Sequence, residues 1–310
     1  MHPAFSVIFF TTLAGAAQGL VVALAVAQLA GVDSPRAFTL SALTVSLVLL
    51  LAGLVSSTFH LGRPERGWRA MAMWRTSWLS REVIVLPAFI GLVALWLLLE
   101  AIGSLPALRP AIALVAIALA ALLWLCTAMI YACLKFIQEW AHPLTLVNYV
   151  LLGLASGLVL AAAIAALTGA GALAHATAAW GLAATLLAAV TRGASLVRNA
   201  RLRPRSTLAS ATGIRGPHLR QTAMGMSAGA FNTREFFHGK PLWLVQRVKH
   251  AFLLLAFALP AALLLAALLT REPAWLLLAL LVQYVGLLAE RWFFFAQARH
   301  PQNLYYQVVS

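Results

Sequence analysis

Eight long apolar runs make up most of this sequence and limit how it can fold. The chain has 310 residues, of which 63% are hydrophobic and only 10% charged, whereas a water-soluble domain carries about 25% charged residues. A helix needs roughly 20 apolar residues to cross a bilayer, and only helices or closed barrels satisfy their backbone in lipid. Continuous Leu, Ala and Val runs, rather than short alternating ones, favour helices. The sequence therefore predicts one all-α integral membrane domain over residues 1–310, with eight transmembrane helices at about 5–30, 38–60, 82–102, 110–133, 145–168, 172–196, 249–270 and 273–296.

The basic residues are divided unequally between the two sides of this predicted bundle. Nineteen Lys and Arg residues lie on the side of the chain termini, eleven of them in residues 192–249, and only Arg36, Arg109 and Arg271 lie on the other side. Basic loops stay in the cytoplasm, so both termini are expected to be cytoplasmic. A net charge of +14 spread in this way is explained by membrane topology and does not indicate nucleic acid.

Residues 56–82, SSTFHLGRPERGWRAMAMWRTSWLSRE, are a polar interruption between the second and third apolar runs. They contain five arginines, three tryptophans, one histidine and two acids. Because apolar runs flank the segment, it is expected at the cytoplasmic membrane surface. Donors, acceptors and rings at this density suit a small amphiphilic molecule that arrives from lipid and exchanges protons with water, and a quinone is the obvious candidate.

His60 and Glu82 are the residues of this segment expected to do the chemistry. A neutral His60 imidazole at the end of the second span can bond a quinone carbonyl and pass a proton. Glu82, expected in the first turn of the third span after an N-cap at Ser77 or Ser80, can relay protons. Two simpler explanations stay open: acids are favoured at helix N-termini, and an interfacial histidine can bond a neighbouring loop. The other candidates for the pocket, which serve equally well as topology determinants and an aromatic belt, are Arg63, Arg66, Trp68, Trp74, Ser77, Trp78 and Arg81.

Other redox and transport chemistries are disfavoured by the positions of the polar residues. Every histidine lies at a span end or outside the spans, so two axial haem ligands would not face each other inside the bundle. Cys126 and Cys133, expected to be buried structural thiols, form no CxxC, which argues against an iron–sulfur cluster or metal site on this chain. No series of carboxylates crosses the bilayer, which argues against a pump or transporter.

Residues 198–249 form a second charged connection, and loops of about fifty residues are uncommon without a purpose. The aromatic residues Phe231, Phe236, Phe237 and Trp243 are poorly suited to a merely solvated tether. We interpret the segment as a cytoplasmic docking surface for a peripheral protein. A basic loop lying on anionic lipid is the alternative.

Four segments of the chain resemble a known family: MHPAFSVIFFTTLAGAAQGL, STFHLGRPERGWRA with SWLSRE, EWAHPLTLVNYVLLGLASG, and FNTREFFHG. The sequence resembles the membrane-anchor subunit of the dimethyl sulfoxide reductase family over essentially its whole length. The resemblance implies an eight-helix anchor without haem, in the bacterial cytoplasmic membrane, that binds menaquinone or ubiquinone. It also implies two partners: a ferredoxin-like subunit with four 4Fe–4S clusters, and a catalytic subunit with molybdopterin guanine dinucleotide. The family's quinone-site histidine and acid fall on His60 and Glu82, and Arg66 and Arg81 correspond less closely.

Within this group, the chain looks most like the anchors of complexes that oxidise sulfite in the cytoplasm and reduce quinone. The expected function is therefore electron transfer from an iron–sulfur partner, docked over the loop of residues 60–82, to the membrane quinone pool. Two alternatives stay open. One is a quinol-oxidising anchor of a dimethyl sulfoxide or related reductase, and the other is a purely structural tether without a quinone site.

Overall fold

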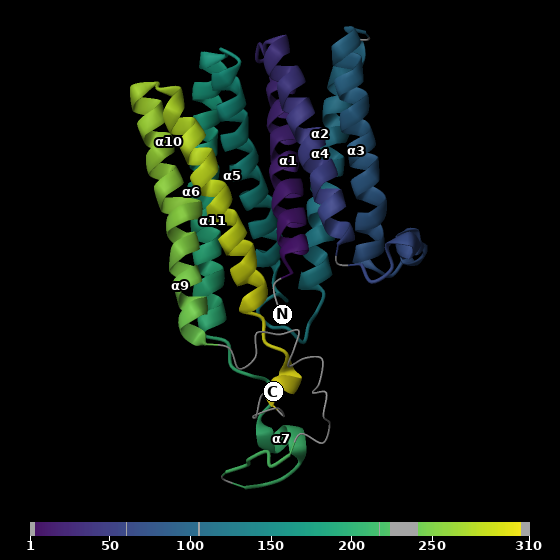
Figure 1. The fold of residues 1–310 in the computed structure, drawn as a ribbon, viewed down its shortest axis with the longest axis vertical. Coiled ribbons are helices and arrows are strands. Elements are labelled where there is room, and N and C mark those ends of the chain that lie inside the picture. The colour runs from purple at the N-terminus through teal and green to yellow at the C-terminus, as the bar shows by residue number, and fades with distance from the viewer. Residues whose placement is uncertain (1–3, 60, 105, 217, 224–240, 305–310) are drawn as a thin grey trace.

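The computed structural model describes residues 4–59, 61–104, 106–216, 218–223 and 241–304. The described elements are all helical, and eight segments are long and apolar enough to cross a membrane (Figure 1), which confirms the prediction of an all-α protein with eight transmembrane helices. The spans are α1 (Phe5–Leu29), α2 (Arg36–Thr58), α3 (Trp78–Ile102), α4 (Arg109–Ala132), α5 (Pro143–Leu167), α6 (Gly171–Ala200), the continuous α9, η3 and α10 (Leu242–Phe252, Leu253–Ala258, Leu259–Thr270), and α11 (Pro273–Ala296). The shorter helices are η1 (Pro64–Met73), η2 (Pro106–Leu108), α7 (Leu208–Thr212) and η4 (Pro301–Leu304).

Successive spans alternate in direction, so their connections gather at the two ends of the bundle. α1 begins and α11 ends at the lower end in Figure 1, where η1, α7 and η4 also lie. The connections at the upper end are short, at residues 30–35, 103–108, 168–170 and 271–272. They join antiparallel neighbours, as short helix–helix connections do.

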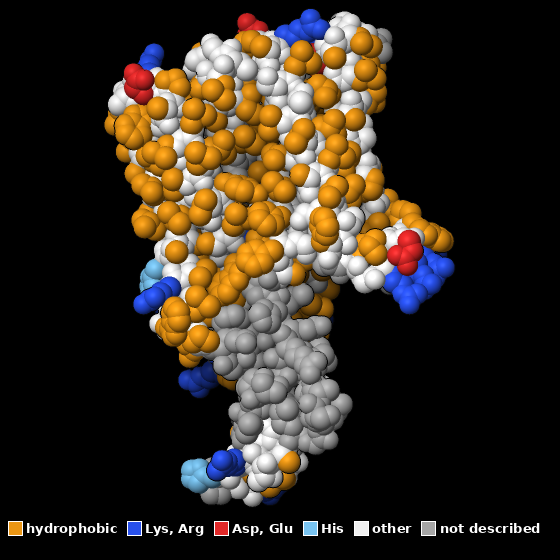
Figure 2. All heavy atoms as spheres, in the orientation of Figure 1, with side chains coloured by type: hydrophobic (Ala, Val, Ile, Leu, Met, Phe, Trp, Pro, Cys, Tyr) orange, Lys and Arg blue, Asp and Glu red, His pale blue; other side chains and the backbone are white. Residues whose placement is uncertain are grey.

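The side of the bundle is apolar and suited to contact with lipid. Figure 2 shows hydrophobic side chains over the flanks of the spans, and Lys and Arg at the two ends. Large side chains along the spans point outward, including Leu98, Val190 and Leu281, each more than half exposed. A continuous apolar surface of this kind marks an interaction with membrane.

α1 and α5 form the central pair, because both contact helices on each side of the bundle. They are also the most buried spans. Of the most apolar stretch of each, 67% is buried in α1 and 61% in α5, whereas this share does not exceed 44% in any other span. Gly19 of α1 lies directly against the backbone of Gly153 and Gly157 of α5, and an added methyl group would overlap that backbone. The small residues spaced four apart therefore let the two helices approach closely.

α11 is held against the seventh span by a similar close approach. The backbone hydrogen bonding of that span changes from α-helical to π-helical at Leu253–Ala258. Gly286 of α11 lies against the backbone of Leu255 and Ala256 in this turn, where no side chain would fit. This contact sets the position of the end of α11 that carries Glu290 and Arg291.

The described helix ends differ from the predicted ones by four residues or more at three places near the lower end, since α6 also continues to Ala200, past the predicted end at residue 196. α3 begins at Trp78, before the predicted start at residue 82, because Ser77 caps it by accepting a hydrogen bond from the Ser80 amide. The seventh span begins at Leu242, before the predicted start at residue 249, so the connection after α6 is shorter than expected. Phe231, Phe236 and Phe237 lie outside the described residues.

Candidate functional site

The loop that holds most of the predicted quinone-pocket residues is exposed. η1 begins with Pro64 at its first position and has no buried residue among Pro64–Met73. Trp68 and Trp74 are 66% and 52% exposed. Arg66 lies 4.0 Å from Glu65, and both of these side chains are more than half exposed, so their ion pair contributes little stability. His60 lies outside the described residues, and Arg63 is exposed at the start of the loop.

Arg81 ties the end of this loop to α3. Its Nε and Nη2 atoms donate hydrogen bonds to the carbonyl oxygens of Trp74 and Arg75, both at 2.9 Å. Its guanidinium also lies 4.2 Å from the centroid of the Trp78 ring, a cation–π contact. Arg81, Ser77 and Trp78 therefore shape the junction between loop and helix, and Trp78 packs on the hydrophobic core.

Glu82 lies inside the bundle, away from the exposed loop. It is the fifth residue of α3, so the expected position in the first turn is wrong, because the helix begins earlier at Trp78. Its side chain is buried, with 5% of the residue exposed, and one carboxylate oxygen accepts a hydrogen bond from the Thr127 hydroxyl of α4. An acid that only stabilises the N-terminus of its helix would need neither burial nor a hydrogen-bond partner on another helix. The position of Glu82 therefore argues against this simpler explanation. Intramembrane acids of this kind are rare and commonly functional.

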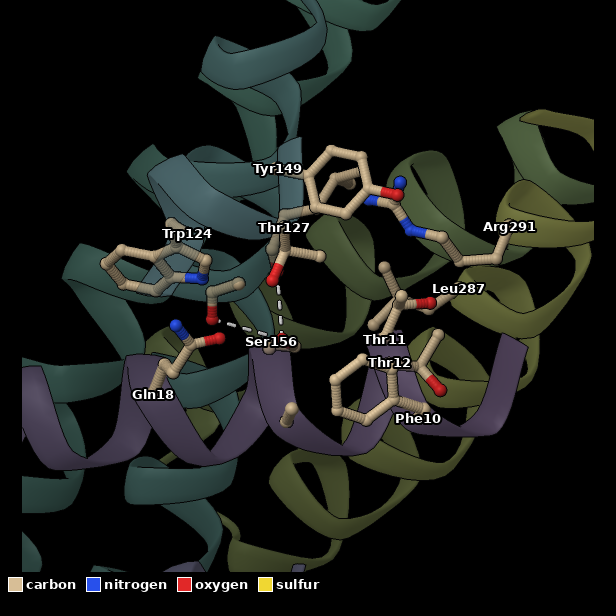
Figure 3. A pocket seen from close by; sticks show the side chains of 14 residues that line it. Phe10, Thr11, Thr12, Gln18, Trp124, Thr127, Tyr149, Ser156, Leu287 and Arg291 are labelled. Atoms are coloured by element: carbon tan, nitrogen blue, oxygen red, sulfur yellow. Dashed lines mark hydrogen bonds between the residues drawn. The ribbon is translucent and has the colours of Figure 1, made fainter. Parts of the chain in front are cut away.

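Behind Thr127 lies a cavity between α1, α4, α5 and α11, seen in Figure 3. It has room of about 20 Å³ for the centres of water molecules, and one water needs about 10–15 Å³ by this measure. The cavity therefore accepts about one water and is too small for a quinone ring. The polar side chains that line it are Thr11, Thr12, Gln18, Trp124, Thr127, Tyr149, Ser156 and Arg291.

A buried ion cluster borders the same cavity. Arg192 of α6 lies 2.7 Å from Glu290 of α11, and Arg291 lies 3.4 Å from the other Glu290 oxygen. The Arg291 guanidinium also lies 3.8 Å from the centroid of the Tyr149 ring, and Figure 3 shows these two side chains together at one end of the cavity. At most 5% of each ion-paired side chain is exposed.

The position of Arg192 was not anticipated from the sequence. The charge count placed it with the cytoplasmic loop, but it lies within α6 and only 2% of it is exposed. One sequence signal could have located it, because apolar residues continue past it to Leu196 and Val197. An arginine inside a span needs a buried acid, and Glu290 is that partner.

A cluster of aromatic rings packs next to the cavity, in contact with Tyr149 of its lining. Tyr131 of α4 lies 5.3 Å from Trp140 and 5.4 Å from Phe294 and Phe295 of α11, measured between ring centroids. Trp140 donates a hydrogen bond from Nε1 to the Phe294 carbonyl at 3.0 Å. These edge-to-face contacts hold the connection between α4 and α5 against α11.

A large groove opens at the same end, next to the aromatic cluster. The volume of this groove is about 1310 Å³. Its rim is mainly basic, and the lining residues include Lys135, Arg203, Arg205, Lys249 and Arg299.

Two other polar groups near this groove help to hold its walls. The one acid among its described lining residues is Glu139, whose carboxylate accepts a hydrogen bond from the Arg299 amide at 3.5 Å. Burial raises the pKa of Glu139 above its ordinary value. The neighbouring Arg198 side chain donates to the Gln138 carbonyl at 3.0 Å.

The two cysteines differ in their surroundings. Cys126 is buried, as expected, but Cys133 is exposed. The expectation of two buried thiols is therefore wrong for Cys133, because α4 ends at Ala132 and the thiol lies just beyond it.

Comparison with known proteins adds to this geometry. The family model described as DMSO reductase anchor subunit (DmsC) matches residues 1–297. A relative from Allochromatium vinosum, which is named as a sulfite dehydrogenase subunit, is 47% identical over 340 aligned positions, which cover 100% of both chains. The resemblance noted in the sequence is confirmed, and the chain belongs to the family of DMSO reductase anchor subunits.

Proposed function

We propose that this chain, a membrane anchor of a molybdoenzyme complex, exchanges electrons between the membrane quinone pool and an iron–sulfur partner subunit. One observation carries the proposal: the carboxyl group of Glu82 is buried in the lower part of the bundle and bonded to Thr127. Reduction of a quinone consumes protons as well as electrons. A buried carboxyl group next to the membrane surface can supply those protons where the quinone ring would lie.

The residues near Glu82 in the sequence are proposed to have different roles in binding the quinone. His60 is proposed to bond the quinone head, as the family resemblance implies. Arg81 and Ser77 fix the junction that leads to Glu82. The exposed Trp68 and Trp74, with Arg63 and Arg66, suit the membrane surface, where they would guide a quinone arriving from lipid.

The proposed direction of electron flow is from sulfite to quinone. The full-length relative from Allochromatium vinosum is named as a subunit of sulfite dehydrogenase. Sulfite oxidation releases electrons, which the iron–sulfur partner would pass to the anchor, and quinone would take them up with protons from Glu82. An anchor that oxidises quinol for a dimethyl sulfoxide reductase would use the same residues in reverse, and assaying the complex with sulfite and with dimethyl sulfoxide distinguishes the two.

The lower end of the bundle is the proposed docking side for the iron–sulfur subunit and the proposed cytoplasmic side. The basic groove between α6, α9 and the end of α11 would accept an acidic surface of that partner. Replacing Arg203 and Arg205 by Glu should reduce recovery of the iron–sulfur subunit when the anchor is purified. Arg271→Glu at the opposite end is the control, and equal recovery from both would contradict docking at this groove.

The proton role of Glu82 is tested by Glu82→Gln in the intact complex. The variant should lose about 100-fold or more of its quinone-linked turnover and keep its activity with an artificial electron acceptor. Glu100→Gln is the matched control, since Glu100 is a second buried acid of α3 at the opposite end, paired with Arg109 at 2.8 Å. Full quinone turnover in Glu82→Gln, or no binding of a quinone analogue to the wild-type complex, would favour a purely structural tether.

A further inference from the structure

Thr127 connects Glu82 with the internal cavity. Its hydroxyl proton is directed at Glu82, and the residue also lines the cavity. A hydroxyl that donates one hydrogen bond can still accept another through its oxygen. Thr127 is therefore able to join Glu82 to any polar molecule in the cavity.

The cavity contains a buried donor that needs an acceptor. Trp124 is 4% exposed, and among the described residues nothing accepts a hydrogen bond from its Nε1 atom. The indole nitrogen lies over Gly153, where a Cβ atom would be only 2.6 Å away, and in Figure 3 it faces the space near Gln18 and Ser156. Leaving a buried N–H group without an acceptor costs free energy, because the group has lost its hydrogen bond to water, so a partner there is favoured.

A water molecule fits both the size of this cavity and the hydrogen-bonding groups that line it. The available room corresponds to about one molecule. A water at this place could accept from Trp124 and donate to the oxygens of Thr127 and Ser156, which makes about three hydrogen bonds, the usual number for buried water. The lining extends from Gln18, in the middle of α1, to Thr11 and Arg291, nearer the charged end. Exchange with the aqueous phase would come from that end.

We propose that this cavity binds a water molecule that returns protons to Glu82 through Thr127. The inference rests on the proposed function, in which Glu82 gives a proton to the quinone. The resulting carboxylate then takes the Thr127 hydroxyl proton, forming one O–H bond as another breaks. Thr127 takes a proton from the water, and the water regains one from the aqueous phase, so that no electron moves in these steps.

Gly15→Ala tests the water without removing any polar group. Gly15 lines the cavity, and an added Cβ would meet only Gly153 Cα, at an ordinary distance of 3.9 Å. The methyl group therefore fits and occupies space that the water needs. Gly91→Ala in α3 is the matched control, because its Cβ would meet nothing within 4 Å.

The measurements are made on the intact complex in lipid nanodiscs. Gly15→Ala should lower quinone-linked turnover about tenfold or more, as expected for loss of a positioned proton donor, and should increase the solvent isotope effect. Activity with an artificial acceptor and the affinity for a quinone analogue should match those of Gly91→Ala. Turnover and isotope effect equal to those of Gly91→Ala would overturn the proposal.

Thr127 supplies a second test that does not depend on filling the cavity. Thr127→Val removes the hydroxyl and should lower quinone turnover like Gly15→Ala, whereas Thr127→Ser keeps the hydroxyl and should retain most of it. Thr177→Val is the control, since Thr177 is a buried threonine of α6 whose hydroxyl donates to carbonyls of its own helix. Equal turnover in Thr127→Val and Thr127→Ser would contradict a relay through Thr127.

The outcomes for the water and for the quinone site are separable. If Glu82→Gln loses quinone turnover while Gly15→Ala and Thr127→Val keep it, the water relay is wrong and the quinone function stands. If Glu82→Gln keeps full turnover, or the wild-type complex binds no quinone analogue, the proposed function itself is wrong.

Discussion

Glu290 pairs with two buried arginines inside the bundle, and its charge offsets theirs. Replacing it by Gln would leave Arg192 and Arg291 without an opposite charge among the described residues around them. Removing one partner of a buried ion pair costs about 3–5 kcal/mol, so Glu290→Gln should unfold at a clearly lower temperature in detergent. Glu65→Gln, which alters an exposed pair, should unfold like the wild type, and an unchanged melting temperature for Glu290→Gln would contradict this account.

Glu139 makes the stability of the folded chain depend on pH. Burial raises its pKa in the folded chain above the ordinary value of 4.5, so the unfolded chain ionises first as pH rises. The folded state then loses stability as pH increases from about 4.5 through the folded pKa. Glu139→Gln should therefore be more stable than the wild type at neutral pH, and the difference should vanish at more acidic pH. Chemical denaturation at several pH values measures this, and a difference independent of pH would refute it.

At the scale of elements, the contact between α1 and α5 organises the bundle. Gly157→Ala should be destabilising, because its added methyl group would overlap the backbone of Gly19 and Leu20. Overpacking costs about 1–3 kcal/mol where neighbours can shift, and two helix backbones shift less readily than side chains. Gly193→Ala in α6, where nothing lies within 4 Å, should be neutral or slightly stabilising. Thermal unfolding in detergent compares the two, and equal stability would mean that the helices move apart at little cost.

At the scale of the whole molecule, the charges and loops divide between two ends, and the lower end is expected to be cytoplasmic. Cys133 provides a natural reporter because it is exposed at that end, whereas Cys126 is buried. A membrane-impermeant maleimide should label Cys133 in inverted vesicles washed free of peripheral subunits, but not in right-side-out vesicles. Asp33→Cys in a Cys133→Ala background, at the opposite end, should show the reverse, and the opposite pattern would invert the topology.

The sequence by itself determined the number of spans, because the length of an apolar run can be compared directly with bilayer thickness. It also limited the N-cap of the third span to Ser77 or Ser80, since N-caps act over a few neighbouring residues, and it located the family motifs, which are local. The candidate acid Glu82 was found in the same way, by its place next to the polar loop.

Only the tertiary structure decided which way these residues face. The spans are apolar on nearly all sides, so their sequences contain little of the periodicity that identifies a buried face. That Glu82 bonds Thr127, that Arg192 pairs with Glu290, and that Trp68 and Trp74 face outward depend on how each helix is rotated against neighbours distant in sequence. Packing of backbones at glycines such as Gly19 and Gly286 sets those rotations.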